Sequence, residues 1–238
     1  MKVLITTDLY STATNGVVTS VRNLMEELER KGHEVRILTV SEKLKSHVEG
    51  NVYYIKSLPL DVVYPDVRMP LSYHHRFFRE LVAWKPDVIH SQCEYFSYHF
   101  AVYISKKTGA PIVHTYHTLY EQYVTYVLPS QRIGNFLVAK LSRLRLRNAD
   151  AIVAPTQKVE HVLRGYGIRN PIHVIPSGIA LEQHKHRITP EERAEKRREL
   201  GIPENTTVLI NLGRLGTEKN ITELIDMLSM ALAHAPNL

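Results

Sequence analysis

The residues best suited to chemistry lie near the carboxyl end, in the segment Gly213–Asn220, which reads Gly-Arg-Leu-Gly-Thr-Glu-Lys-Asn. It follows an apolar run and precedes a helix-like pattern. Arg214 and Lys219 therefore stand near the amino end of a helix, where guanidinium, ammonium and backbone N–H groups all attract phosphate oxygens. This arrangement indicates a diphosphate site. The alternative is an ordinary exposed helix start capped by Thr217, and the segment alone does not decide between the two.

Polar residues also follow the other predicted strands at their carboxyl ends. Open parallel sheets bind ligands at that edge. The strand ends in question are Asp8, His90–Glu94, His114–Thr118, Pro155-Thr156, Pro176–Gly178 and Gly213-Arg214. Their common position predicts one site along one rim of the sheet.

The first of these loops ends in Asn15-Gly16, just before a helix-like run. Glycine lets the chain turn sharply and allows a ligand to approach the backbone closely. The loop lacks the G-x-G-x-x-G fingerprint, so a nicotinamide-dependent oxidoreductase has little support. A plain Asn-Gly turn with no ligand remains the alternative.

Two histidines, His114 and His117, lie in a stretch of tyrosines and threonines. Their spacing does not place both on one side of a strand end, so at most one is expected to reach a substrate. A structural role is the alternative for either. His90 could join them around zinc, but no carboxylate or thiol spacing supports this, and we predict no metal site.

Strand-like apolar runs alternate with helical patterns along the chain. Such alternation predicts an α/β fold with a mainly parallel, Rossmann-like sheet and helices on both faces. The predicted strands are Lys2–Thr7, Glu34–Val40, Val52–Ser57, Asp87–Ser91, Pro111–Tyr116, Asp150–Pro155 and His173–Pro176.

A change in composition divides the chain. We predict a first domain at 1–178, a charged linker with a solvated helix at 179–205, and the first βα unit of a second Rossmann-like domain at 206–238. That last unit cannot bury its own apolar face without further strands or a partner. We therefore expect the second domain to be truncated.

Composition narrows the class of protein. The chain has 238 residues, is 44% hydrophobic and 23% charged, and contains one cysteine, Cys93. These values are typical of a soluble globular protein in a reducing compartment, so we expect a cytoplasmic location. The net charge of +6 favours anionic partners such as nucleotides or acidic lipid headgroups.

Two segments mix basic and apolar residues in the manner of helices that lie on membranes, namely Arg68–Trp84 and Lys140–Arg147. A helix that packs on a sheet also has an apolar stripe and a charged outer face. Membrane contact and simple packing are therefore both open for each segment. If these segments contact a membrane, we expect the protein to lie peripherally at its inner face.

Together these motifs resemble those of the family 4 retaining glycosyltransferases of the GT-B fold. The matching segments occur in the family's order and span nearly the whole chain. They are Thr7-Asp8, Asn15–Ser20, Pro86–Ser91, His114–Thr118, Asp150–Thr156, Ile175–Ile179 and Gly213–Asn220. The stretch 114–123 is most similar to bacterial enzymes that glucosylate diacylglycerol.

The resemblance implies transfer of glucose from UDP-glucose to a diacylglycerol-type lipid, with retention and with no obligatory metal, no cofactor and no nucleic acid. Gly16 matches the family's glycine loop near the diphosphate. His117 matches the histidine that contacts the transferred sugar, and Arg214 and Lys219 match the pair that neutralises the leaving diphosphate. The acceptor-side candidates are Asp8, Asn15, Tyr116 and Tyr120.

One departure concerns activity. The family's Glu-x7-Glu motif, which holds the nucleotide ribose and the donor sugar, has no counterpart before Leu238. We therefore expect the isolated chain to transfer little or no sugar. Two alternatives stay open: a soluble or other lipid acceptor such as an inositol or sugar phosphate, and a non-catalytic interaction module. No oligomeric state is predicted.

Overall fold

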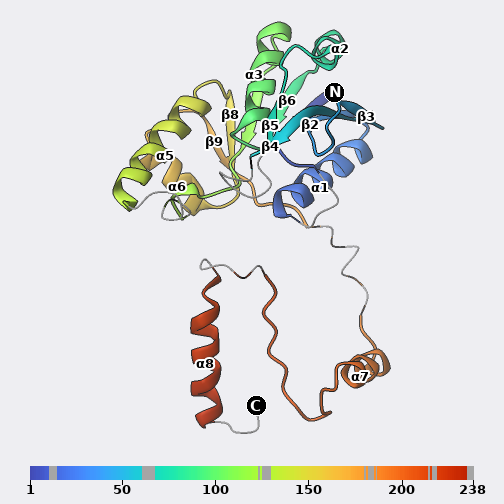
Figure 1. The fold of residues 1–238 in the computed structure, drawn as a ribbon, viewed down its shortest axis with the longest axis vertical. Coiled ribbons are helices and arrows are strands. Elements are labelled where there is room, and N and C mark those ends of the chain that lie inside the picture. Colours follow the sequence, from blue (N-terminus) through green and yellow to red (C-terminus); the bar gives the residue numbers. More distant parts are fainter. Residues whose placement is uncertain are drawn as a thin grey trace. The chain divides into compact units, whose positions relative to one another are not determined.

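A computed structural model gives the fold of the chain (Figure 1). It describes residues 1–10, 15–60, 68–122, 124, 130–179, 181, 185, 187–213, 215 and 219–234. The chain forms two compact units, Met1–Ile179 and Ala180–Leu238, and each is described by itself. Arg214 lies outside the described residues, so its predicted role stays a prediction.

The first unit is built on one sheet with the strand order β3-β4-β2-β1-β6-β7-β8-β9, and β5 pairs with β4. All the pairs are parallel except those that β3 and β5 make with β4. The strands are β1 (Lys2–Thr6), β2 (Glu34–Ser41), β3 (His47–Glu49), β4 (Val52–Pro59), β5 (Arg68–Pro70), β6 (Val88–Ser91), β7 (Ile112–Thr115), β8 (Ala151–Ala154) and β9 (Ile172–Val174). The predicted α/β fold with a mainly parallel sheet is confirmed.

Helices alternate with the parallel strands. In the first unit they are α1 (Gly16–Arg30), α2 (Arg76–Trp84), α3 (Phe96–Thr108), the 3-10 turn η1 (Tyr120–Gln122), α5 (Gln131–Leu146) and α6 (Gln157–Gly165). None of the helices in the described part of the chain is both long enough and apolar enough to cross a bilayer.

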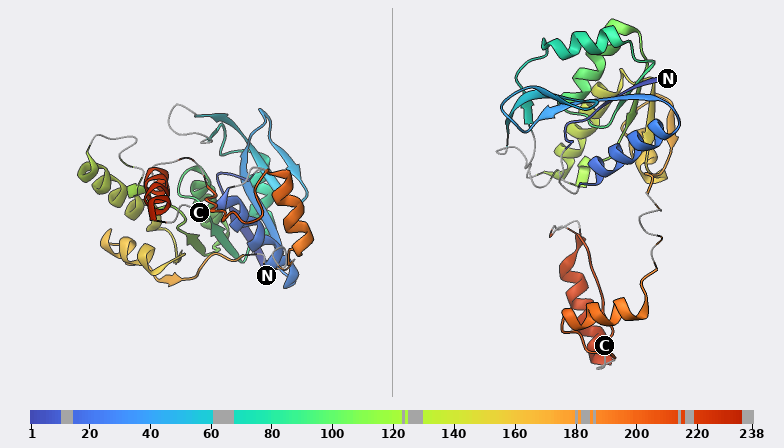
Figure 2. Two further views of the ribbon diagram at one scale, coloured as in Figure 1. Left: turned by 90° about the horizontal axis from the view of Figure 1, so that it is seen from below. Right: turned by 90° about the vertical axis from the view of Figure 1, so that its right-hand side faces the viewer.

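The two faces of the sheet are covered by different helices. Neighbouring residues of a strand point to opposite faces. Val3 and Ile5 accordingly join a core cluster with Val21 of α1, whereas Leu4 joins a larger cluster that includes Phe78 of α2 and Phe100 of α3. The right-hand view of Figure 2 shows α1 on one side of the sheet and α2 and α3 on the other. Helices on both faces, as predicted, are confirmed.

The strand order places the candidate site. The chain leaves β1 toward β2 on one side, and it later returns to add β6 and β7 on the other side. The point where the direction reverses is where open α/β sheets bind ligands. Residues that follow β1, β6 and β7 therefore meet at one edge of the sheet.

The second unit contains two helices, α7 (Pro190–Glu199) and α8 (Ile221–His234). A capping box formed by Thr189 and Glu192 starts α7, and all its side chains remain outside any core. The strand expected from Thr207 does not form in the described residues, and Leu209 and Ile210 are exposed. The physical reason is that a strand needs neighbouring strands to satisfy its backbone groups, and the described part of this unit has none. The predicted domain boundaries themselves stay predictions.

Candidate active site

A buried carboxylate, Glu94, organises the residues at the carboxyl ends of β6 and β7. The Tyr120 hydroxyl donates a hydrogen bond of 2.5 Å to its Oε2, and His114 Nε2 lies 3.2 Å from its Oε1. Burial raises the pKa of Tyr120, and the negative charge of Glu94 adds to the rise, so the phenol keeps its proton and acts as a donor. One carboxylate thus holds one side chain from β7, His114, and one from the segment after it, Tyr120.

His117 is positioned by a separate contact. Its Nε2 lies 2.8 Å from Gln92 Oε1, and with the amide oxygen turned toward the ring Nε2 carries the proton, because an amide oxygen only accepts. Burial lowers the pKa of His117 to about 4, so the ring is neutral near pH 7. Its Nδ1 is consequently a hydrogen-bond acceptor, suited to a sugar hydroxyl. The histidine predicted to reach substrate is held in one tautomer.

His90 and Cys93, at the end of β6 and just after it, have structural roles. His90 points to the opposite face of the sheet, where its Nε2 lies 2.8 Å from Thr115 Oγ1, and burial lowers its pKa to about 3. Burial raises the pKa of the Cys93 thiol well above its ordinary value, so the thiol keeps its proton near pH 7. In the described part of the chain, no group of three His, Cys, Asp or Glu side chains is arranged to hold a metal.

Asp8 follows β1 and caps α3 from outside the helix. Its Oδ1 accepts a 2.7 Å hydrogen bond from the backbone N–H of Ser97, where the N-cap residue Tyr95 gives no side-chain cap. Its Oδ2 is buried and unpartnered among the described residues. Burial raises the pKa of Asp8 to about 6. This cap explains the residue without a ligand, and its acceptor-side role stays a prediction.

Asn15 and Gly16 start α1. The Asn15 side chain accepts a 2.8 Å hydrogen bond from Val17 N, which makes it a conventional N-cap. A Cβ atom added at Gly16 would meet no atom of the described residues within 4 Å, so on their side the space beside this backbone is open. The geometry agrees with the plain turn, and it also leaves room for a ligand at Gly16.

The two tyrosines predicted on the acceptor side, Tyr116 and Tyr120, differ in burial. Tyr116 is fully buried and its hydroxyl lies 3.1 Å from Ser142 Oγ, so direct contact with an acceptor does not fit its position. Its ring instead packs edge-on against Tyr120, with centroids 5.9 Å apart. Tyr120 is only partly buried. The structure brings together His117, Tyr120 and the groups that hold them.

Sequence reasoning assigned no role to Glu94 or Gln92, although both follow β6. The signal that could have found them is the adjacency of β6 and β7, which places the residues after one strand beside those after the other. Several buried polar atoms at this edge have no partner among the described residues and could bind water or polar ligand groups. They are Thr6 Oγ1, Gln92 Nε2, Ser97 Oγ and His114 Nδ1.

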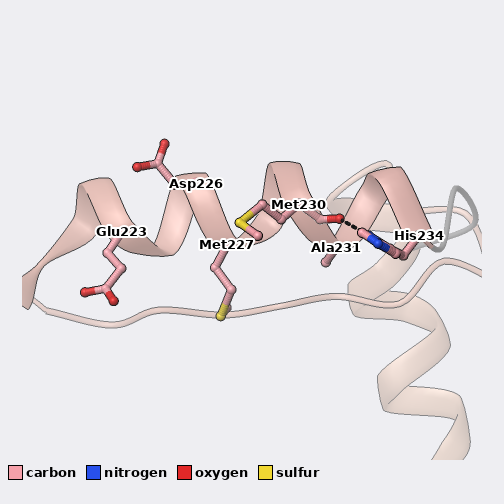
Figure 3. A pocket seen from close by; sticks show the side chains of 6 residues that line it. All are labelled: Glu223, Asp226, Met227, Met230, Ala231 and His234. Atoms are coloured by element: carbon pink, nitrogen blue, oxygen red, sulfur yellow. Dashed lines mark hydrogen bonds between the residues drawn. The ribbon is translucent and has the colours of Figure 1, made fainter.

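In the second unit, Lys219 is exposed and lies close to Gly213, where an added Cβ would be 3.6 Å from Lys219 Cε. A hollow beside α8 is lined by Glu223, Asp226, Met227, Met230, Ala231 and His234 (Figure 3). Its two carboxylates, Glu223 and Asp226, would repel a diphosphate. The hollow is therefore not a donor site, and the diphosphate role of Lys219 stays a prediction.

Comparisons with known proteins place this geometry in a family. The model of Glycosyltransferase Family 4 matches residues 14–183. The chain is 31% identical to an alpha-monoglucosyldiacylglycerol synthase of Streptococcus pneumoniae over 94% of this chain and 51% of the relative. It is 29% identical to a protein of the same name from Acholeplasma laidlawii, over 95% of this chain and 58% of the relative.

A solved structure with the same fold is an alpha,alpha-trehalose 6-phosphate synthase of Burkholderia multivorans, with a TM-score of 0.54 and 13% identity, covering 99% of this chain and 60% of that one. The chain belongs to Glycosyltransferase Family 4. It spans between 51% and 58% of the length of the two curated relatives described above.

Proposed function

We propose that the protein contributes the acceptor-side domain of a retaining glucosyltransferase that moves glucose from UDP-glucose to a diacylglycerol-type lipid. The observation that carries the proposal is the cluster of His117, Gln92, Glu94 and Tyr120 at the edge of the sheet, in a chain of this family. The two relatives named as diacylglycerol glucosyltransferases support the lipid acceptor.

In the proposed reaction, the bond between the glucose anomeric carbon and the diphosphate breaks while the acceptor hydroxyl attacks the same face. The proton of that hydroxyl passes to an oxygen of the departing diphosphate. Negative charge builds up on the departing UDP. Arg214 and Lys219 would stabilise that charge more in the transition state than in the ground state, without a metal. Neutral His117 would accept a hydrogen bond from a sugar hydroxyl through Nδ1, and Tyr120 would line the acceptor side.

The 238 residues alone are expected to transfer little or no sugar. They contain no Glu-x7-Glu motif beyond Lys219 that could hold the nucleotide ribose and the donor sugar. We propose that turnover needs residues of the donor-side domain that this chain does not contain.

The direct test is a transfer assay with the product of the whole reading frame that contains these residues. UDP-glucose is supplied with diacylglycerol in mixed micelles, or with inositol phosphate or a sugar phosphate in solution. An α-linked glucosyl lipid supports the proposal. Transfer only to a soluble acceptor would replace the lipid acceptor, and binding of a partner chain without any transfer would indicate an interaction module.

A further inference from the structure

Two helices of the first unit, α2 and α5, lie in the segments that mix basic and apolar residues. The structure shows that the apolar side chains of the two helices differ in exposure. In α2, the large apolar side chains Phe77, Phe78, Leu81 and Trp84 are all 8% exposed or less and belong to the core. They cannot enter a membrane while the unit stays folded. For α2, simple packing is the correct explanation.

In α5 the large apolar side chains face outward. Its inner row consists of Gly134, Val138, Ser142 and Leu146, which are buried or half-buried. A second row, at helical spacing, consists of Ile133, Leu137, Leu141 and Leu144. A third consists of Arg132, Phe136, Lys140, Arg143 and Arg147. The five large apolar residues of the two outer rows are between 40% and 63% exposed.

The charge of α5 is of one sign. Between Ser130 and Ala149 the sequence has five basic residues and no acidic one. Arg145 contacts His99. The other four, Arg132, Lys140, Arg143 and Arg147, make no ion pair with any described residue. An apolar row beside an unpaired basic row is the pattern by which a helix lies in the interface of an anionic membrane.

We propose that the outer rows of α5 dock the protein onto an anionic lipid surface. The inference deepens the proposed function and rests on its lipid acceptor. The same helix packs beside the candidate site. Ser142 Oγ lies 3.1 Å from the hydroxyl of Tyr116, whose ring packs against Tyr120, and Gln131 donates a 3.0 Å hydrogen bond to the Glu121 carbonyl of η1. Docking through α5 therefore brings the acceptor side of the site to the lipid in which the acceptor resides.

The test uses the 238-residue chain and vesicles of phosphatidylcholine, alone or mixed with an equal amount of phosphatidylglycerol. Co-sedimentation is expected with the mixed vesicles only. The variant Ile133→Gln/Leu141→Gln/Leu144→Gln removes apolar groups without changing charge. The variant Arg132→Gln/Lys140→Gln/Arg147→Gln removes charge. Each is expected to weaken binding about tenfold or more, because each loses several apolar or electrostatic contacts.

The matched control, Lys45→Gln/Lys56→Gln/Arg79→Gln, removes the same number of charges from exposed positions of the first unit outside α5 and should bind within about twofold of the parent, because charges away from the docked surface are screened. Phe136→Trp adds a fluorescence reporter, since the one native tryptophan, Trp84, is buried. Its emission should shift to the blue with anionic vesicles. Circular dichroism checks that each variant is folded.

Equal loss of binding in the control variant would overturn the proposal, and so would an unshifted Phe136→Trp emission. Sedimentation of the chain as a dimer that the leucine variant dissolves, without vesicle binding, would show that a second copy covers α5 instead. Vesicle binding is measured independently of sugar transfer. Vesicle binding through α5 by an enzyme that glucosylates only soluble acceptors would therefore overturn the proposed function and leave the docking surface intact.

Discussion

Glu94 is the residue on which the candidate site depends most. It is nearly buried, and it accepts from Tyr120 while His114 contacts its other oxygen. A carboxylate can accept with both oxygens, whereas an amide has only one accepting oxygen. An isosteric amide at this position would keep an acceptor for the Tyr120 hydroxyl and turn an N–H group toward His114, which must then change tautomer or lose the contact.

Glu94→Gln is accordingly expected to lower the free energy of unfolding by about 1–3 kcal/mol, the usual consequence of an unsatisfied buried donor. Urea denaturation followed by circular dichroism measures it. Glu80→Gln is the matched control, because Glu80 forms an exposed 3.8 Å pair with Arg76 and should change stability by less than about 0.5 kcal/mol. Equal effects of the two substitutions would contradict the role given to Glu94.

Asp8 should give the protein a pH-dependent stability. Burial raises the pKa of the Asp8 carboxyl to about 6 in the folded protein, whereas its ordinary value, expected in the unfolded chain, is 3.8. Stability from this group is thus fully present below the unfolded pKa and is lost as pH rises through the folded pKa. Asp8→Asn keeps the acceptor for Ser97 N–H and removes the buried charge.

The free energy of unfolding of Asp8→Asn should exceed that of the parent by up to about 3 kcal/mol at about pH 7.5. At about pH 4 the two proteins should be almost equally stable. Urea midpoints at the two pH values test it. A difference that does not depend on pH would show that Asp8 does not titrate in this way. Loss of sugar transfer by the whole reading-frame product that carries this substitution, together with the gain in stability, would support the acceptor-side role.

At the scale of elements, α5 is held close to its neighbour by a glycine. A Cβ atom added at Gly134 would lie 1.7 Å from Val124 Cγ1, which is a severe overlap. By contrast, an added Cβ at Gly165, at the end of α6, meets no atom within 4 Å in the part of the chain that the structure describes. The two glycines therefore make a matched pair within helices of the same unit.

Gly134→Ala is expected to cost about 1–3 kcal/mol, because the overlap forces the helix or Val124 to move. Gly165→Ala should be neutral or stabilising by up to about 1 kcal/mol, because alanine is the better helix former. Thermal or urea unfolding of the two variants measures both. Similar stabilities for the two would mean that α5 does not pack tightly at this point.

The sequence predicted the elements better than the contacts between them. Alternating strands and helices are local patterns, so the sheet and its polar rim could be predicted. The antiparallel strands β3 and β5 have only three residues each and lie outside the alternation of strands with helices, so that alternation does not predict them. The role of Glu94 depends on partners 20 and 26 residues away. The basic segments of α2 and α5 look alike in sequence, and only burial distinguishes them.

At the scale of the whole molecule, the two units differ in how much they bury. The first has a core formed by both faces of its sheet. In the second, α7 and α8 have no buried side chain among their residues. We expect the first unit to persist without the second.

Limited trypsin digestion of the 238-residue chain should therefore leave a resistant fragment that ends between Ile179 and Lys196, identified by mass spectrometry. Exposed basic residues such as Arg187 and Arg193 offer the cleavage sites. Early cleavage inside α3 or α5 would instead show that the first unit does not hold together alone.

The central claim is that this chain belongs to an enzyme that glucosylates a diacylglycerol-type lipid. The most direct measurement is NMR analysis of the product formed from UDP-glucose and diacylglycerol by the whole reading-frame product, beside its His117→Ala variant. The account predicts an α-glucosyl diacylglycerol from the parent and a loss of about a hundredfold or more in the variant, since the variant lacks the contact to the sugar. A β-linked product, an unglucosylated lipid, or an unimpaired variant would contradict it.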